Sequence, residues 1–236
     1  MGRIFDVSFV YLYLDDIVKG APVALLITVV SFFSGILIGL FAALAKIHKL
    51  PVLSQIVTFY TSFTRGTPLL VQLFLLYYGL PIVSEALNAQ FGWGLDVRGV
   101  PALAYALVVF SLNTGAYLTE TVRGAIEAVD IGQYEAAQSI GMSGFQTHTR
   151  IVLPQAFLVA LPNLGNTVIA LLKDTSLAYV ITVMEIMGSA RRVGGAGYRY
   201  FEAFIAAALV YWVICILMEL VTTRFERRML RKRGLL

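Results

Sequence analysis

The sequence has very few of the residues from which enzyme active sites are usually built. Its 236 residues include one cysteine and two histidines, so it can form neither an intramolecular disulfide nor a multi-cysteine metal site. It contains no Gly-x-x-x-x-Gly-Lys-Ser/Thr nucleotide loop and no His-Glu-x-x-His motif. We therefore expect that the chain by itself is not an enzyme, that it binds no metal or cofactor, and that any ATP is used on another subunit.

Charged residues are also scarce, at 14 %, whereas 58 % of the residues are hydrophobic and the mean hydropathy is +0.80. This composition is typical of an integral membrane protein and not of a soluble domain. The net charge is +4, but residues 224–236 alone carry +5. A basic cluster beside a membrane helix follows the positive-inside rule. It argues against nucleic-acid binding, which places basic groups on a folded face or arm.

Apolar runs predict an all-α membrane protein with five transmembrane helices. A run of about 20 apolar residues, rising about 1.5 Å per residue, crosses a hydrocarbon core of about 30 Å. Residues 1–19 mix aromatic and charged side chains and suit an N-terminal interfacial segment, residues 20–223 form the transmembrane domain, and residues 224–236 form a basic cytoplasmic tail. The spans are expected at about residues 20–45, 67–83, 101–123, 157–187 and 203–223.

The basic loop at Lys46–Lys49 and the basic tail fix the expected orientation. Both belong in the cytoplasm, so the N-terminus lies outside and the C-terminus inside. Three crossings then bring the polar segment 124–154 to the cytoplasmic side. Within it, two helical pieces are separated by Gly141 and Gly144. Such a bent element is either a docking point for a cytoplasmic motor or an ordinary amphipathic loop.

Two features of the first spans leave alternatives open. Arg65 either precedes the second span, with residues 51–64 as a helical extension on the cytoplasmic side, or lies within one long helix. Small residues also recur every fourth position along the first span, which permits close approach of a helix from the same chain or from a second copy. These small residues are Ser31, Gly35, Gly39 and Ala43.

Polar residues inside the later spans indicate either a wet pathway or hydrogen bonding between helices. Asn113, Tyr117 and Glu120 share one face of the third span. The run Lys173-Asp174-Thr175-Ser176 interrupts the fourth span, whose preceding helix is too short to cross alone, so that residues 178–187 are expected to complete the crossing. Lys173 and Asp174 either face a pathway or pair with each other, with Glu120 or with arginines. The run Gly194–Gly197 is expected to be a flexible outer loop.

Residues 133–154 carry a more specific motif. It consists of Glu135-Ala136-Ala137, three residues, Gly141, nine residues and then Ile151-Val152-Leu153-Pro154. This motif resembles, without a gap, the EAA loop of ABC importer permeases. Further stretches are similar to the polar amino-acid branch of that family, the histidine, glutamine and cystine type. They are residues 65–72, 113–124, 153–156 and 173–177, and the resemblance covers about residues 20–225.

The resemblance implies the type I ABC importer permease fold, in a bacterial cell (inner) membrane. The permease would pair with itself or a sister permease, and would dock two copies of an ATPase that binds ATP and Mg. It would receive a polar amino acid from an extracellular or periplasmic binding protein, and would move it by ATP-driven alternating access.

Carried over residue by residue, the resemblance assigns ATPase coupling to Glu135, Ala136, Ala137, Ser139 and Gly141. The small alanine side chains allow close approach and Gly141 permits a turn. Glu135 would meet a basic group on the ATPase or cap the helix start.

For the substrate pathway, Asp174 would accept the ammonium group of an amino acid. Thr175, Ser176 or freed backbone N–H groups would bind its carboxylate. The other pathway candidates are Lys173, Asn113, Tyr117, Glu120 and Gln72.

Two other classes of function compete with this one. A self-contained amino-acid carrier or channel would usually show more spans or a visible repeat, whereas five spans suit half of a symmetric pore. A membrane scaffold or receptor would not need Asn113, Glu120 and Asp174 at membrane depth.

Overall fold

The computed structural model describes residues 6–232, which form helices and contain no strand. Five helical segments are long and apolar enough to cross a membrane, which confirms the predicted number: Ala21–Ile47, Leu69–Phe91, Ala102–Glu127, Gly144–Ile181 and Tyr200–Arg231. In chain order the elements are α1 (Val7–Val18), α2 (Ala21–Ile47), α3 (Leu53–Gly66), α4 (Leu69–Phe91), α5 (Ala102–Glu127), α6 (Ile131–Ser139), α7 (Gly144–Thr147), the π-helical turn η1 (His148–Val152), α8 (Leu153–Asp174), the 3-10 helix η2 (Thr175–Ile181), α9 (Ile186–Gly197) and α10 (Tyr200–Lys232).

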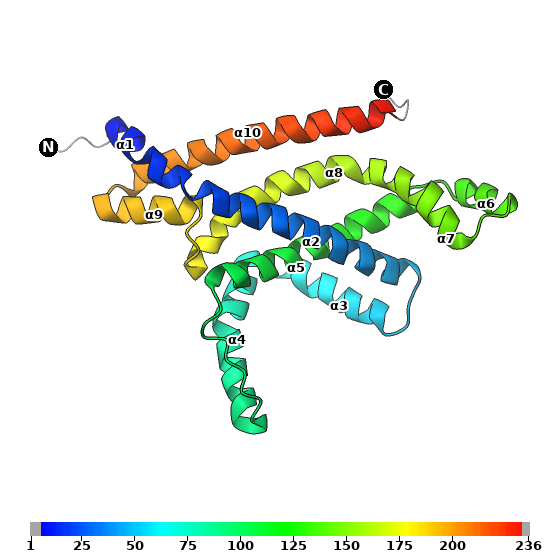
Figure 1. Ribbon diagram of the computed structural model, residues 1–236, viewed down its shortest axis with the longest axis horizontal. Coiled ribbons are helices and arrows are strands. Elements are labelled where there is room, and N and C mark those ends of the chain that lie inside the picture. Colours follow the sequence, from blue (N-terminus) through cyan, green and yellow to red (C-terminus); the bar gives the residue numbers. More distant parts are fainter. Residues whose placement is uncertain (1–5, 233–236) are drawn as a thin grey trace.

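The long helices form a bundle with two distinct ends (Figure 1). Helices α2, α5, α8 and α10 run alongside one another. Helices α6 and α7 lie at one end of this bundle, whereas α1 and α9 lie at the other (Figure 1). Helix α4 leaves the bundle and extends away from it, on the side opposite α10 in this view.

The stripe of small residues on α2, Ser31, Gly35, Gly39 and Ala43, packs against α5 of the same chain. All four residues of the stripe are buried. A Cβ atom on Gly35 would lie 2.7 Å from Thr114 Cγ2, and one on Gly39 would lie 2.9 Å from the backbone carbon of Leu118. The stripe therefore brings two helices of the same chain into close contact.

The second span, α4, is preceded by a separate helix, α3, and a proline joins the two, so Arg65 precedes the span. Arg65 lies in the last turn of α3, Thr67 is extended (φ −119°, ψ 144°) and α4 begins directly after Pro68. The residue before a proline is driven out of the helical region, which explains the break. The hydroxyl of Tyr60 in α3 donates to the carbonyl of Leu112, so the helical extension at residues 53–66 packs against the middle of α5.

The fourth crossing differs from the expected one. The helix tightens from α to 3-10 at Thr175 and ends at Ile181, because Thr182 adopts a left-handed conformation (φ 68°). The prediction that residues 178–187 complete the span is therefore wrong beyond Ile181. The prediction of a flexible loop at Gly194–Gly197 is also wrong, since these residues form the last turn of α9.

Glu185 starts α9 and ties it to the bundle. Its fully buried carboxylate accepts hydrogen bonds from the backbone N–H groups of Met187 and Gly188, both at 2.8 Å, and from the Tyr211 hydroxyl of α10 at 2.5 Å. Burial raises the pKa of this carboxyl, and the hydrogen bonds act in the opposite direction. A Cβ atom on Gly20 would lie 2.4 Å from the Glu185 carbonyl carbon, so the chain between α1 and α2 packs directly on this cap.

Both ends of the described chain are helical. Phe9, Val10 and Ile17 of α1 are buried in one apolar cluster with residues of α9 and α10, so the expected interfacial segment is packed onto the bundle. At the other end α10 continues to Lys232, which makes residues 224–232 of the basic tail a helical extension of the last span. Residues 1–5 and 233–236 lie outside the described part.

Candidate functional site: a polar cavity and the helices at one end of the bundle

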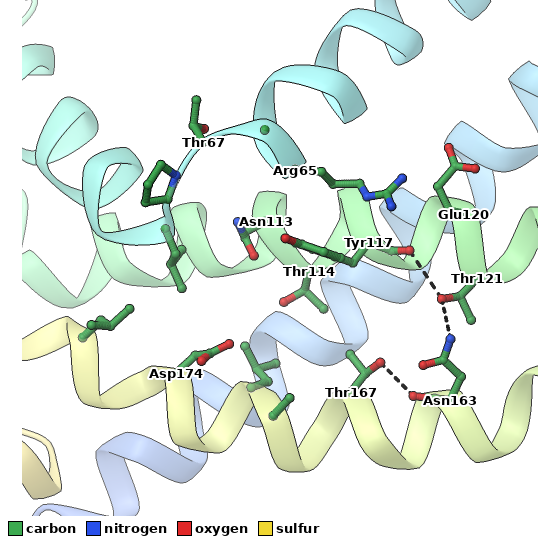
Figure 2. A pocket seen from close by; sticks show the side chains of 16 residues that line it. Arg65, Thr67, Asn113, Thr114, Tyr117, Glu120, Thr121, Asn163, Thr167 and Asp174 are labelled. Carbon is green, nitrogen blue, oxygen red and sulfur yellow. Dashed lines mark hydrogen bonds between the residues drawn. The ribbon is translucent and has the colours of Figure 1, made fainter.

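A cavity of about 820 Å³ lies between α3, α5 and α8 (Figure 2). Its wall is unusually polar for a position within apolar helices, which indicates a wet site and not a lipid-facing one. The polar side chains that line it are Arg65, Thr67, Asn113, Thr114, Tyr117, Glu120, Thr121, Asn163, Thr167 and Asp174.

Four of the predicted pathway residues meet in this cavity. Asn113, Tyr117 and Glu120 face it from α5, and Asp174 faces it from the end of α8 (Figure 2). The sequence pattern had grouped the first three on one helical face, and the tertiary fold brings the fourth to them.

Of the run that interrupts the fourth span, only Asp174 lines the cavity. Thr175 is buried and its hydroxyl donates to the Leu172 carbonyl at 2.6 Å, while Lys173 and Ser176 are not among the lining residues. No ion pair within 4.0 Å involves Lys173 or Asp174 in the part of the chain that the structure describes. The alternative in which these two charges pair is therefore wrong.

Gln72 is not among the residues that line the cavity, but its side chain holds parts of the cavity wall in place. Its Nε2 atom donates to the carbonyls of Thr64 and Thr67, at 2.8 and 3.0 Å, and its Oε1 atom accepts from Asn113 Nδ2 at 3.1 Å. The break between α3 and α4 leaves these carbonyls without helical partners, so Gln72 replaces the missing hydrogen bonds. It also orients Asn113, which itself lines the cavity.

Glu120 is already engaged by two cations. Its Oε1 atom lies 2.7 Å from Lys46 Nζ at the end of α2, and its Oε2 atom lies 2.9 Å from Arg123 Nη2. Arg123 in turn pairs with Glu127 at 2.7 Å. This network ties α2 to α5, so the Glu120 carboxylate forms part of the cavity wall and is not free for a ligand.

Arg65 and Asp174 give the cavity one cationic and one anionic group. The guanidinium of Arg65 lies 5.5 Å from the centre of the Tyr117 ring, a cation–π contact. Figure 2 shows Arg65 and Asp174 coming from opposite walls, with Tyr117 between them. Neither forms an ion pair within 4.0 Å among residues 6–232, so both charges are available to a ligand.

Sequence reasoning missed the contribution of α8 to this cavity. Thr167 and Asn163 lie about two and three turns before Asp174 on the same helical face. Asn163 Nδ2 donates to Thr121 Oγ1 of α5 at 3.0 Å (Figure 2). The spacing of these polar residues within the apolar helix α8 would have indicated a cavity-facing side.

The predicted coupling segment folds into α6, a turn and α7. Asp130 caps α6 by accepting from the Gly132 N–H at 2.6 Å, so the prediction that Glu135 caps this helix is wrong. Gly141 adopts φ +85°, a left-handed conformation that favours glycine, and no atom lies within 4 Å of the place where its Cβ would be. Ala137 is buried, and Glu135 and Ala136 are exposed.

Large apolar side chains of this segment, before and after the turn, are exposed. Ile131 is 69 % exposed, and Ile140 and Phe145 are each 79 % exposed. Ser139, another predicted coupling residue, is exposed beside them and donates to the Ala136 carbonyl at 2.8 Å. Exposed apolar side chains of this size at the end of the bundle are of the kind that binds a partner protein.

An aromatic cluster connects α6 to the bundle. The Tyr134 ring of α6 meets the His148 ring edge-on, at 5.4 Å between centroids, and His148 lies 5.8 Å from the His48 ring just after α2. The two histidines of the chain, distant in sequence, thus link the coupling segment to the ends of α2 and α8.

Comparison with known proteins agrees with this architecture. The probable amino-acid permease YxeN of Bacillus subtilis (strain 168) is 40 % identical over 224 residues, 95 % of this chain and 96 % of the relative. The L-cystine transport system permease TcyL of the same organism is 38 % identical over 93 % of this chain and 89 % of its own length. The arginine transport system permease ArtQ, also from that organism, is 35 % identical over 90 % of this chain and 92 % of its own length.

The fold has also been seen in solved structures. The crystal structure of an amino acid ABC transporter with histidines contains a chain with a TM-score of 0.81 and 33 % identity, covering 96 % of this chain and 100 % of that chain. The MetNI methionine transporter shares the fold at a TM-score of 0.71 and 18 % identity, over 92 % of this chain and 97 % of its own. The family model for the binding-protein-dependent transport system inner membrane component matches residues 35–231. The chain belongs to this family of ABC transporter permeases.

Proposed function

We propose that this permease moves a polar amino acid through the cavity between α3, α5 and α8, in an importer driven by ATP. The observation that carries the proposal is the pair of uncompensated charges, Arg65 and Asp174, on opposite walls of one polar cavity. The names of the relatives support the substrate class, since they refer to amino acids, cystine and arginine.

The two charges match the two ends of a zwitterion. Asp174 accepts hydrogen bonds from the substrate ammonium, and the Arg65 guanidinium donates to its carboxylate. Arg65 thus takes the role that the sequence pattern gave to Thr175 and Ser176. Asn163 and Thr167 offer hydrogen bonds to a polar side chain of the substrate.

The exposed apolar side chains before and after the Gly141 turn suit docking to a cytoplasmic ATPase. In this proposal each of two ATPase copies, which hold ATP and Mg, receives α6 from one permease copy, and a second copy or a sister permease completes the pore. Helices α6 and α7 then lie in the cytoplasm, the N-terminus outside and the C-terminus inside. An amino-acid-binding protein delivers the substrate at the outer end.

Asp174→Asn tests the cavity in the assembled transporter in vesicles, with uptake of labelled amino acids as the readout. We expect uptake to fall at least about tenfold, because the amide loses the charge that pairs with the ammonium. Lys173→Gln is the matched control, since it changes the charge of the adjacent residue outside the cavity, and it should retain uptake. Wild-type uptake by Asp174→Asn would refute the pathway role. Transport by the permease alone in liposomes would instead support a self-contained carrier.

Gly141→Asp tests the docking role. A side chain at φ +85° strains the turn between α6 and α7, and we expect the ATPase to be lost during co-purification. Gly124→Asp is the control, because Gly124 is also exposed with open space around it but has no positive φ. Intact ATPase binding and transport by the Gly141 variant would show that this turn does not dock the ATPase.

A further inference from the structure

Tyr198, at the end of α9, combines backbone strain with almost complete exposure. It adopts a left-handed conformation (φ 52°), and its N–H donates to the Gly194 carbonyl to close the helix. Its side chain is 92 % exposed. A residue with a Cβ atom in this conformation costs about 1–2 kcal/mol, and glycine is the usual residue at such a position.

The glycine next to Tyr198 serves a different purpose. A Cβ atom on Gly197 would lie 2.7 Å from the Phe9 ring of α1, so Gly197 is required for packing. The following position, which needs the left-handed conformation, is occupied by tyrosine. No hydrogen bond or ring contact of the Tyr198 side chain within residues 6–232 compensates for the strain. Uncompensated strain of this kind points to a role outside the chain.

Two arginines of the same helix accompany Tyr198. Arg191 and Arg192 are exposed, and neither has a carboxylate within 4.0 Å among the residues that the structure describes. The guanidinium of Arg191 lies 4.8 Å from the centre of the Tyr179 ring, which holds it in place. Arg191 and Arg192 lie in α9 and Tyr198 caps its C-terminal end, so all three belong to one short element. Tyrosine and arginine, with tryptophan, are the residue types enriched in the energetic centres of protein interfaces.

This group lies at the end of the bundle opposite α6 and α7 (Figure 1). The inference therefore rests on the proposed function, in which α6 and α7 are cytoplasmic and α9 faces outward. The family transports substrates that a separate binding protein delivers. We propose that Tyr198, with Arg191 and Arg192, is an anchor for that soluble binding protein. The tyrosine ring enters an apolar depression on the binding protein, and carboxylates at its rim pair with the two arginines.

Tyr198→Gly separates docking from folding. Glycine tolerates φ 52° without strain, so the variant permease should melt at the wild-type temperature or above it. The permease–ATPase complex in lipid nanodiscs would be titrated with the ligand-loaded amino-acid-binding protein that stimulates the wild-type ATPase. We expect the half-maximal concentration to rise about tenfold or more, as for a central interface tyrosine.

Two further variants sharpen the test. The double variant Arg191→Gln, Arg192→Gln should weaken docking and reduce its dependence on salt, because the interface loses two charges. Phe59→Ala is the control, since Phe59 is 73 % exposed on α3, away from α9, and its half-maximal concentration should equal that of the wild type.

Each other outcome contradicts the proposal in a recognisable way. Wild-type affinity of Tyr198→Gly would refute the anchor. Wild-type affinity together with a lower melting temperature would instead identify Tyr198 as a lipid-interface aromatic, and loss of the permease pair would identify it as a contact with a second copy. If no binding protein stimulates the wild-type complex, the proposed function fails together with this inference. If stimulation is normal and Tyr198→Gly behaves as the wild type does, the anchor alone fails.

Discussion

Adding one methyl group at Gly39 should separate the two most closely packed helices of this protein. In Gly39→Ala the new Cβ atom would lie 2.9 Å from both the carbonyl carbon and the Cβ of Leu118, and 3.0 Å from the Thr119 nitrogen. Carbon atoms pack at about 3.5–4.0 Å. Two of the three atoms belong to the α5 backbone and the third is fixed to it, so no change of rotamer relieves the contact.

The helices must therefore move apart by roughly 0.5–1 Å along this stretch, taking 3.5–4.0 Å as the carbon contact distance. Overpacking of this kind costs about 1–3 kcal/mol. For a protein of this size each kcal/mol lowers the melting temperature by about 2–4 °C, which gives a decrease of about 2–12 °C. Thr114 of α5 packs on Gly35 and also lines the cavity, so uptake should fall as well.

The assay is thermal unfolding of the purified permease in detergent, followed by uptake in vesicles. Gly124→Ala is the matched control, because Gly124 lies in α5 and a Cβ atom added there would meet no atom within 4 Å. This control gains the helix preference of alanine, worth up to about 1 kcal/mol, without the clash. If Gly39→Ala were as stable as Gly124→Ala, the close contact of α2 with α5 would not be the one described.

Three further outcomes follow from polar contacts that are fully or partly buried. Because burial raises the pKa of Glu185, the folded chain retains a proton that the unfolded chain releases, so stability should decrease as pH rises from the ordinary carboxyl pKa to the raised one. Melting temperatures measured between about pH 4 and about pH 8 should show this decrease in the wild type and not in Glu185→Gln, and an equal slope in the two proteins would contradict the prediction. Glu120→Gln should cost about 1–3 kcal/mol, since it leaves Lys46 without its partner; adding Lys46→Met should recover part of the melting temperature, and additive losses would exclude a coupled pair. Gln72→Leu should cost about 1–3 kcal/mol by leaving two carbonyls unsatisfied, and wild-type melting would show that the α3–α4 break does not depend on this amide.

The crossings could be predicted because hydropathy acts on each segment separately. The uncharged run of α2 is long enough to span by itself, and the Gly141 turn follows from local backbone preference. The pairing of α2 with α5 could not be predicted, because the spacing of Gly35 and Gly39 indicates a close contact without identifying the other helix.

The cavity was harder to predict because it depends on which side of each helix faces which neighbour. Adjacent residues such as Lys173 and Asp174 point about 100° apart around a helix. The sequence therefore predicts both near a pathway, whereas in the structure only Asp174 lines the cavity. Arg65 was uncertain for a similar reason, since its surroundings are set by Tyr117 on another helix. The error about the cap of α6 was local, because Asp130 stands directly before the first helical residue, which is the ordinary position of a capping side chain.

The uninterrupted helix from Gly144 to Ile181 has a mechanical consequence. Phe145, exposed beside the coupling turn, and Asp174, in the cavity, lie on one rod and are separated by roughly 43 Å at about 1.5 Å per residue. A tilt of about 5° around one end would displace the other by roughly 4 Å over that length, more than a hydrogen bond spans. The π-helical turn at His148–Val152 and the 3-10 segment after Asp174 are the places where this rod departs from α geometry. If the ATPase docks at α7 as proposed, its push would reach the Asp174 carboxylate as a rotation of this rod, and any loss of motion would arise at those two turns.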